Sequence, residues 1–382
     1  MRPPRRTADG QPIAGTMARF LLWPIWILQL FGGAKSFVGN PLLGSATLNG
    51  WGLHTTRVRL AHAATQLRWW LLAPLAAAEL RQRFRTQGYL VLENYLPPAD
   101  FERLKVAIEA CRAEVREMRQ GDTLTLRVLL DDDALVALPP CRALLAGKEF
   151  INLLRYCAAT LRWPHFYVQC IKHGASHDPQ KALHADTFHP TMKAWLFLSD
   201  ADVRNGPFTF VPGSQRPTAA RLAWEREQSL CAGGGNRYSA KGSLRIAEAE
   251  LPRLGLPPAV ALSVRANTLV IANTHGFHRR GDAPPGSSRL EIYASSRTNP
   301  FLPLPLPGSR LLSRVEHRIV AAYYRHLDRQ AAARGTRSSW HIVPCEQLHA
   351  AVAGLPASTG CGAPAAVNAP PTGSPPGTIA AK

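Results

Sequence analysis

Six short runs of strand-forming residues constrain the fold of this chain more than any other feature. Loops rich in Gly, Pro and Asp separate them. This pattern is typical of a β-sandwich or barrel and not of alternating strand–helix units. We therefore predict a mainly β domain with flanking helices. The runs are residues 123–130, 165–171, 193–198, 207–211, 267–272 and 289–295.

The regions on either side of these runs predict further segments. The sequence from Gly88 onward predicts a strand, a Pro-Pro turn, and a helix with one apolar stripe. Residues 311–334 predict a second helix, packed on the outside of the barrel. The expected divisions are a disordered basic extension (1–16), a helical, apolar N-terminal arm (17–84), the β domain (85–300), a C-terminal helical extension (301–354) and a disordered Pro/Ala/Gly tail (355–382).

The charge balance indicates which partners the chain favours. Lys and Arg number 45 against 26 Asp and Glu, a net charge of +19. Such a surplus favours phosphates, anionic lipids or acidic metabolites. The chain lacks the interleaved aromatic and basic residues of a nucleic-acid-binding motif, so we expect no nucleic acid as partner.

Two apolar segments near the N-terminus predict peripheral membrane contact. Residues 20–31 (FLLWPIWILQLF) are too short to cross a bilayer. Within residues 57–72, Arg57, Arg59 and Arg68 alternate with apolar residues and lead into two tryptophans, as in a basic helix at a membrane surface. The alternative is a helical arm packed on the β domain. Seven cysteines without a CxxC pair indicate a reducing compartment. We therefore expect a cytoplasmic protein, peripheral at the inner face of the membrane.

The segment LHADTFHP carries the first metal-binding signal. His184 and Asp186 are two residues apart, at the end of a short strand, so that an imidazole and a carboxylate can face one ion. A third ligand is expected from LVIANTHGFHRRG, as His278 or His275, and His189 is a further candidate. Two histidines and one carboxylate on one face leave positions open, as in non-haem Fe(II) oxygenases.

Arg289 strengthens this interpretation. It follows His278 by eleven residues, across a turn, on the expected next antiparallel strand, and this spacing favours His278 over His275. Its planar guanidinium suits the distal carboxylate of 2-oxoglutarate in a way that a lysine does not. His173 and His177, in a polar loop, are expected at the surface or in contact with substrate. Substrate contacts are also expected from the loop 216–243, with Trp224, Glu225 and Arg237.

These segments together resemble the phytanoyl-CoA dioxygenase family of Fe(II)- and 2-oxoglutarate-dependent oxygenases. The resemblance rests on GYLVLENYLPP, HADTFHP, NGPFTFVPGS and Arg289, and covers roughly residues 85 to 300. It implies a double-stranded β-helix, the cupin-like jelly roll. It also implies that His184, Asp186 and His278 bind Fe(II), that Arg289 binds 2-oxoglutarate, and that O₂ is the oxidant.

The resemblance carries two further implications. It places Trp195 in the wall of the 2-oxoglutarate pocket, although a tryptophan in the core is the alternative. A carboxylate at Asp186, where related halogenases have a small residue, predicts hydroxylation and not chlorination. The stretch HRRGDAPPGSSR departs from the family pattern, because Arg279, Arg280 and Asp282 replace its usual Asn and Ser.

The function predicted is therefore that of a dioxygenase that hydroxylates a small-molecule or acyl substrate, which can be anionic, and releases succinate and CO₂. One rival is a non-catalytic basic module that binds lipid or anions on a jelly-roll scaffold. Another is a metal-dependent cupin-type enzyme without 2-oxoglutarate, which leaves Arg289 unexplained. Neither the substrate nor the oligomeric state follows from the sequence.

Overall fold

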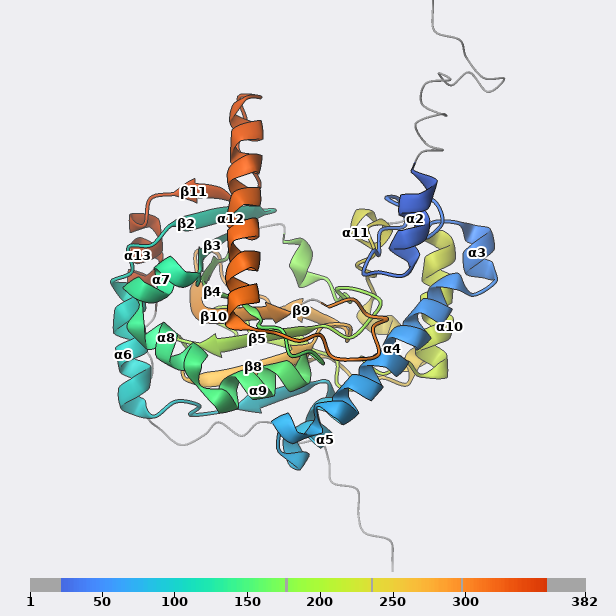
Figure 1. Cartoon of the computed structure of the whole chain (residues 1–382), viewed down its shortest axis with the longest axis horizontal. Helices are drawn as coiled ribbons and strands as arrows, with labels where there is room; N and C mark the ends of the chain where they lie inside the picture. The colour runs from blue at the N-terminus through green and yellow to red at the C-terminus, as the bar shows by residue number, and fades with distance from the viewer. Residues whose placement is uncertain (1–21, 176–177, 235, 297, 356–382) are drawn as a thin grey trace, which may run out of the picture.

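Two antiparallel sheets face each other at the centre of the molecule (Figure 1). The computed structural model describes residues 22–175, 178–234, 236–296 and 298–355. The segment 1–16 lies outside the described residues, as does the tail 355–382 beyond Leu355.

The larger sheet has the strand order β1-β8-β5-β10-β4-β3-β2-β11, and the smaller has the order β7-β6-β9. From β4 to β10 the chain passes back and forth between the two sheets, and all pairings are antiparallel. This topology is the predicted double-stranded β-helix. The strands are β1 (Tyr89–Leu92), β2 (Val115–Gln120), β3 (Thr123–Leu129), β4 (His165–Lys172), β5 (Met192–Phe197), β6 (Phe208–Phe210), β7 (Val260–Leu262), β8 (Thr268–Asn273), β9 (His278–Arg280), β10 (Ser288–Ser296) and β11 (His341–Val343).

Side chains alternate across the larger sheet and give it two different faces. On β5, Leu196 points into an outer apolar cluster, whereas Trp195 and Phe197 join a cluster between the two sheets. On β10, Leu290 and Ile292 likewise belong to the outer cluster. The residues that alternate with them on that strand, Arg289 and Glu291, are polar and buried on the other face. The outer face therefore supplies the larger apolar cluster, and the inner face combines a smaller apolar cluster with buried polar groups.

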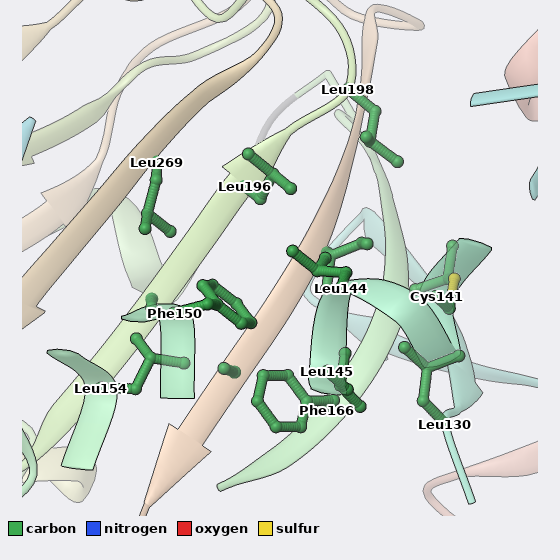
Figure 2. Packing of buried hydrophobic residues seen from close by; sticks show 14 of the residues in the cluster. Leu130, Cys141, Leu144, Leu145, Phe150, Leu154, Phe166, Leu196, Leu198 and Leu269 are labelled. Atoms are coloured by element: carbon green, nitrogen blue, oxygen red, sulfur yellow. The ribbon is translucent and has the colours of Figure 1, made fainter. Parts of the chain in front are cut away.

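Helices cover the outer face of the larger sheet. Figure 2 shows Leu144 and Leu145 of α8 and Phe150 and Leu154 of α9 packed near Leu196, and all five are buried. Each such side chain contributes about 1.5–3 kcal/mol by leaving water. The helices on this side are α6 (Pro98–Glu109), α7 (Asp132–Ala137), α8 (Pro139–Ala146) and α9 (Lys148–Cys157).

A second group of helices lies at the opposite end of the sheets (Figure 1). In α4 of this group, His54 Nε2 donates to Glu225 Oε2 of α10 at 2.6 Å. The group therefore packs partly through buried polar contacts. Its members are α2 (Trp23–Leu30), α3 (Ala46–Gly50), α4 (Leu53–Leu71), α5 (Ala78–Gln87), α10 (Ala219–Cys231) and α11 (Arg237–Ala240). Short 3₁₀ turns occur at Ala73–Leu75, Pro179–Lys181, Glu248–Glu250 and Pro252–Leu254.

Helix α4 uses two of its three arginines inside the molecule, whereas Arg59 is exposed. Arg57 and Arg68 are buried and donate to backbone carbonyls, among them those of Leu30 and Leu302. These two cations are therefore not available to lipid phosphates, contrary to their expected role at a membrane surface. No helix in the described part of the chain combines the length and the hydropathy needed to cross a bilayer.

The C-terminal segment contains the predicted helix and one strand that the sequence did not predict. Helix α12 (Arg310–Ala332) projects from the body (Figure 1), and Arg314 of this helix pairs with Asp132 at 3.0 Å. Its apolar residues Leu311 and Ile319 are exposed. Other residues of the helix contact the outside of the barrel as expected: the ring of His317 lies 5.5 Å from that of His165 on β4, and Asp328 accepts from Arg116 of β2 at 2.9 Å. Strand β11 then joins the edge of the larger sheet beside β2, and α13 (Glu346–Ala353) follows.

Candidate metal centre

A short backbone pairing brings the two histidines together. The N–H of His184 donates to the carbonyl of His278 at 3.0 Å, and the N–H of His278 donates back at 2.9 Å. In this reciprocal antiparallel pair the two side chains lie on the same face, with ring centroids 4.4 Å apart. Segments 94 positions apart in the chain therefore meet at the edge of the smaller sheet.

Asp186 completes a group of three. The residue lies two positions after His184, so its side chain returns to the same face. His184 Nε2 lies 3.8 Å from Asp186 Oδ1, and His278 Nε2 lies 3.7 Å from Asp186 Oδ2. These distances are too long for hydrogen bonds. Among the described residues, this is the one group of three or more His, Cys, Asp or Glu whose ligand atoms all lie within 4.8 Å of one another.

The opposite ring nitrogens set the tautomer of both histidines. His184 Nδ1 lies 2.8 Å from the carbonyl of Ala182, and His278 Nδ1 lies 2.9 Å from that of Gly276. A carbonyl only accepts, so each Nδ1 carries the proton and each Nε2 keeps its lone pair toward Asp186. Burial lowers the pKa of both imidazoles, which keeps them neutral. Two imidazole lone pairs and one carboxylate fit a ferrous ion.

Lys193 on β5 holds the carboxylate in its charged form. Its Nζ lies 2.6 Å from Asp186 Oδ2. Burial by itself raises the pKa of Asp186, but the charge and hydrogen bond of Lys193, together with His278 and His184, outweigh it and hold that pKa well below the usual range. The ion pair was not predicted, although strand alternation puts Lys193 and Trp195 on one face of β5.

Arg289 lies in the same cavity as the three residues. This cavity has a volume of about 200 Å³, and its walls also include Trp195, Arg280 and Lys193. The guanidinium of Arg289 donates through Nε to Glu291, at 3.1 Å, and through Nη1 to the carbonyl of Gly206. Within the described part of the chain no acceptor faces its Nη2. The side chain is therefore positioned by protein contacts at two of its nitrogens.

The sequence profile of the family described as Phytanoyl-CoA dioxygenase (PhyH) matches residues 84–278, which is 195 of 382 positions. The matched range includes both sheets up to β9 and all three residues of the cluster. The chain belongs to the phytanoyl-CoA dioxygenase family. Its members are non-haem enzymes that depend on Fe(II) and 2-oxoglutarate, and this family placement was predicted from the sequence.

Solved structures of non-haem oxygenases also resemble the chain. The epimerase SnoN in complex with Fe³⁺, alpha ketoglutarate and nogalamycin RO is 23% identical, with 58% of this chain and 83% of that one covered and a TM-score of 0.39. HygX from Streptomyces hygroscopicus, with nickel and 2-oxoglutarate bound, is 17% identical over 58% and 86%, with a TM-score of 0.38. A search of curated protein sequences finds no match.

The alternative histidines of this phytanoyl-CoA dioxygenase family member lie outside the cluster. His275 is fully buried, its Nδ1 lies 2.9 Å from the carbonyl of Thr187, and its ring contacts that of His62. His189 Nδ1 lies 3.1 Å from the carbonyl of Pro190. Of the two candidates after β8, His278 is therefore the one that meets His184 and Asp186.

Two expectations for surface or substrate-facing residues were wrong. His173 is buried, and its Nε2 lies 2.9 Å from the carbonyl of Asn205. Burial, with a contribution from the Arg289 charge, lowers the pKa of His173 to about 3. Trp224 and Glu225 are fully buried in α10, and His177 lies outside the described residues.

Trp195 and several polar residues line the cavity. The ring of Trp195 lies 4.5 Å from that of Phe208 and is 7% exposed, so it is both a cavity wall and part of the core. Sequence reasoning missed Arg127, Gln169 and Tyr293, which also line the cavity. Arg127 Nε donates to Gln169 Oε1 at 2.6 Å. The alternation of RLEIYAS could have indicated Tyr293, since it lies on the same face of β10 as Arg289.

Proposed function

We propose that this chain is an Fe(II)- and 2-oxoglutarate-dependent dioxygenase that hydroxylates a small-molecule or acyl substrate, with release of succinate and CO₂. His184, Asp186 and His278 would hold the iron. The observation that carries the proposal is their convergence from two distant segments, with both Nε2 lone pairs directed at one carboxylate. Family membership supports the same reaction class.

Arg289 would bind the distal carboxylate of 2-oxoglutarate. Support comes from its place in the cavity beside the three residues, with Arg280 and Lys193 adding positive charge for a dianion. Bound there, the iron and 2-oxoglutarate would supply the oxidising chemistry for hydroxylation of a C–H bond by O₂. The protein's part is to fix the ligands, to hold the anion and to enclose the reaction.

The charge of the Asp186 carboxylate would be maintained throughout by Lys193, 2.6 Å away. A carboxylate that binds through one oxygen leaves its second oxygen for this lysine, so the pair and the metal are compatible. The carboxylate itself supports hydroxylation over halogenation, since it fills the position a halide would need.

The proposal also places the enzyme in the cytoplasm. Its cysteines support this placement, because all six that lie in the described residues are free thiols. Cell fractionation with an antibody to the full chain tests this, and recovery in a secreted or periplasmic fraction would contradict it.

Succinate release tests the proposed reaction. Wild type, Arg289→Ala and Arg204→Ala would be supplied with Fe(II), 2-oxoglutarate, O₂ and a panel of acyl and anionic compounds. Arg204 is exposed and paired with Asp202, so its loss controls for removing one arginine. We expect release by wild type and Arg204→Ala and a loss of at least about tenfold in Arg289→Ala.

The two rival functions give different results in that assay. A non-catalytic binding module would release no succinate with any variant. An enzyme that does not use 2-oxoglutarate would convert a substrate without releasing succinate and would be insensitive to Arg289→Ala.

A further inference from the structure

Helix α2 presents its apolar side chains to solvent. None of its residues is buried. Leu28 is 72% exposed and Phe31, directly after the helix, is 66% exposed, and Trp23, Ile25 and Ile27 are also exposed. A helix of this composition normally places such side chains in the core. An exposed group of large apolar residues marks an interaction surface.

Polar contacts hold α2 to the rest of the molecule. The amide of Asn40 donates to the Trp26 carbonyl at 3.0 Å and to Gln29 Oε1 at 2.9 Å. Arg57 Nε donates to the Leu30 carbonyl at 2.9 Å. Asn299 donates to the Phe31 carbonyl at 3.0 Å. The helix is thus fixed through its backbone and one polar side chain, and its apolar side chains remain outside.

The charge of the surrounding sequence identifies the partner. Residues 10–78 contain no Asp or Glu, and the first 78 residues contain eight Arg or Lys against Asp9 alone. Of these cations, Arg57 and Arg68 are buried and take no part, whereas Arg59 is exposed. A segment without carboxylates does not repel anionic lipid headgroups, and each cation near them adds attraction. Tryptophans such as Trp23 favour the boundary between headgroups and acyl chains. These properties match a lipid surface.

The length of α2 fits the same partner. Eight residues at 1.5 Å each span about 12 Å. This is enough to lie in the interfacial layer of one leaflet and far too short to cross a hydrocarbon core of about 30 Å. It is also short for a helix–helix seam between two copies, which normally extends over several turns.

The helix ends at the rim of a cleft that reaches the candidate metal centre. This cleft, of about 220 Å³, is lined by Gly33, Lys35 and Thr298 as well as Asp186. Gly33 is two positions after Phe31, and Thr298 precedes the Asn299 that binds the Phe31 carbonyl. Lys35 Nζ donates to the backbone carbonyl of Asp186. A membrane that binds α2 would therefore lie beside the opening of this cleft.

We propose that α2 docks the protein on anionic membranes by inserting its apolar side chains at the lipid interface, with the cleft opening close to the lipid surface. The interaction is independent of the proposed reaction, because it needs neither iron nor 2-oxoglutarate.

Co-sedimentation of the full chain with vesicles tests the proposal. The vesicles are phosphatidylcholine alone, or phosphatidylcholine mixed with phosphatidylglycerol. The test variant carries Ile27→Gln and Leu28→Gln, which removes apolar surface at constant charge. The matched control carries Ile319→Gln and Tyr323→Gln on α12, which are 62% and 58% exposed and one helical turn apart.

We expect wild type and the α12 variant to bind the anionic vesicles, and the α2 variant to bind at least about tenfold more weakly. Binding to phosphatidylcholine alone should be weaker. Equal binding by wild type and the α2 variant, or no binding by wild type, would overturn the proposal. A loss of self-association in the α2 variant, with no vesicle binding by wild type, would assign the helix to a second copy instead.

Tryptophan fluorescence gives a second readout that does not depend on the folding of the α2 variant. Phosphatidylglycerol vesicles with brominated acyl chains should quench part of the wild-type emission, and Trp23→Phe should remove much of that quenching. Trp340→Phe, distant from α2, should leave it unchanged. Quenching that is unaffected by Trp23→Phe would contradict insertion of α2.

Discussion

Two buried groups of histidines and a carboxylate lie next to each other in this molecule, and only one has the geometry of a metal centre. The segment after β4 gives His184 to the first group and His189 to the second, and the segment after β8 gives His278 and His275. In the first group both Nε2 atoms face Asp186, at 3.8 and 3.7 Å.

In the second group the carboxylate is used elsewhere. Glu225 Oε1 accepts from Arg221, at 3.1 and 2.9 Å, and its Oε2 lies 2.6 Å from His54. His275 and His62 face each other with rings 4.8 Å apart. Glu225 is fully enclosed, whereas Asp186 faces a cavity. Several histidines and a carboxylate are therefore not enough to make a metal centre. The carboxylate must also be accessible to a ligand, and the imidazole lone pairs must be directed at it.

The difference predicts opposite results when the two carboxylates are changed. Asp186→Ala removes one of three ligands, so we expect ferrous binding and turnover to fall by about 10³-fold or more, with the melting temperature changed by a few degrees at most. Anaerobic calorimetry with Fe(II) and succinate release measure this. Asp202→Ala, at an exposed ion pair, is the control. Wild-type iron affinity in Asp186→Ala would remove Asp186 from the site.

Glu225→Gln should instead destabilise the fold. It leaves Arg221 buried without its anion, which costs about 3–5 kcal/mol in the free energy of unfolding. Chemical denaturation measures this loss, and the folded fraction should still bind Fe(II). A variant with normal stability and lost iron binding would reverse the roles assigned to the two groups.

Arg289→Lys tests the anion site beside the first group. Lysine keeps the charge but lacks the planar fork, so we expect the KM for 2-oxoglutarate to rise by about 10- to 100-fold, with a smaller change in kcat. Arg204→Lys at the surface should change neither constant. An unchanged KM in Arg289→Lys would assign cosubstrate binding to another cation of the cavity, such as Arg280.

Lowering the pH should destabilise the fold through His62 of the second group. This residue faces Arg221, Glu225, His189 and His275. Burial lowers the pKa of His62 to about 3, from a usual 6.5. The folded state therefore favours the neutral form, and its stabilisation is complete above pH 6.5 and is lost as the pH falls from 6.5 toward 3. His62→Gln should reduce the stability lost between pH 7 and 5 by about 1–2 kcal/mol.

Urea denaturation at both pH values measures that difference. His326→Gln, at an exposed position on α12, should retain the wild-type pH dependence. The same pH slope in His62→Gln and wild type would show that His62 contributes nothing to acid sensitivity.

Much of this architecture followed from the sequence because it rests on local patterns. Alternation within 193–198 and 289–295 located the strands and the inward face that carries Trp195. The spacing from His278 to Arg289 selected the correct histidine for the cluster. Strands β9 and β11, with three residues each, leave no such pattern, since long-range pairing and not local preference makes them extended.

The ion pairs of the site residues could not be predicted from such local patterns. The Lys193–Asp186 ion pair and the Glu291 partner of Arg289 depend on which strands become neighbours. The burial of His173 depends on the loop at Asn205, more than thirty residues away. A polar loop therefore suggested a surface histidine, although tertiary packing encloses it.

The central claim is that His184, Asp186 and His278 hold Fe(II) where 2-oxoglutarate can bind it. Anaerobic addition of Fe(II) and 2-oxoglutarate, followed by visible spectroscopy, tests it most directly. We predict a weak charge-transfer absorption in wild type and in His275→Ala, and none in His278→Ala. No absorption from folded wild type, or the same absorption from His278→Ala, would contradict the claim.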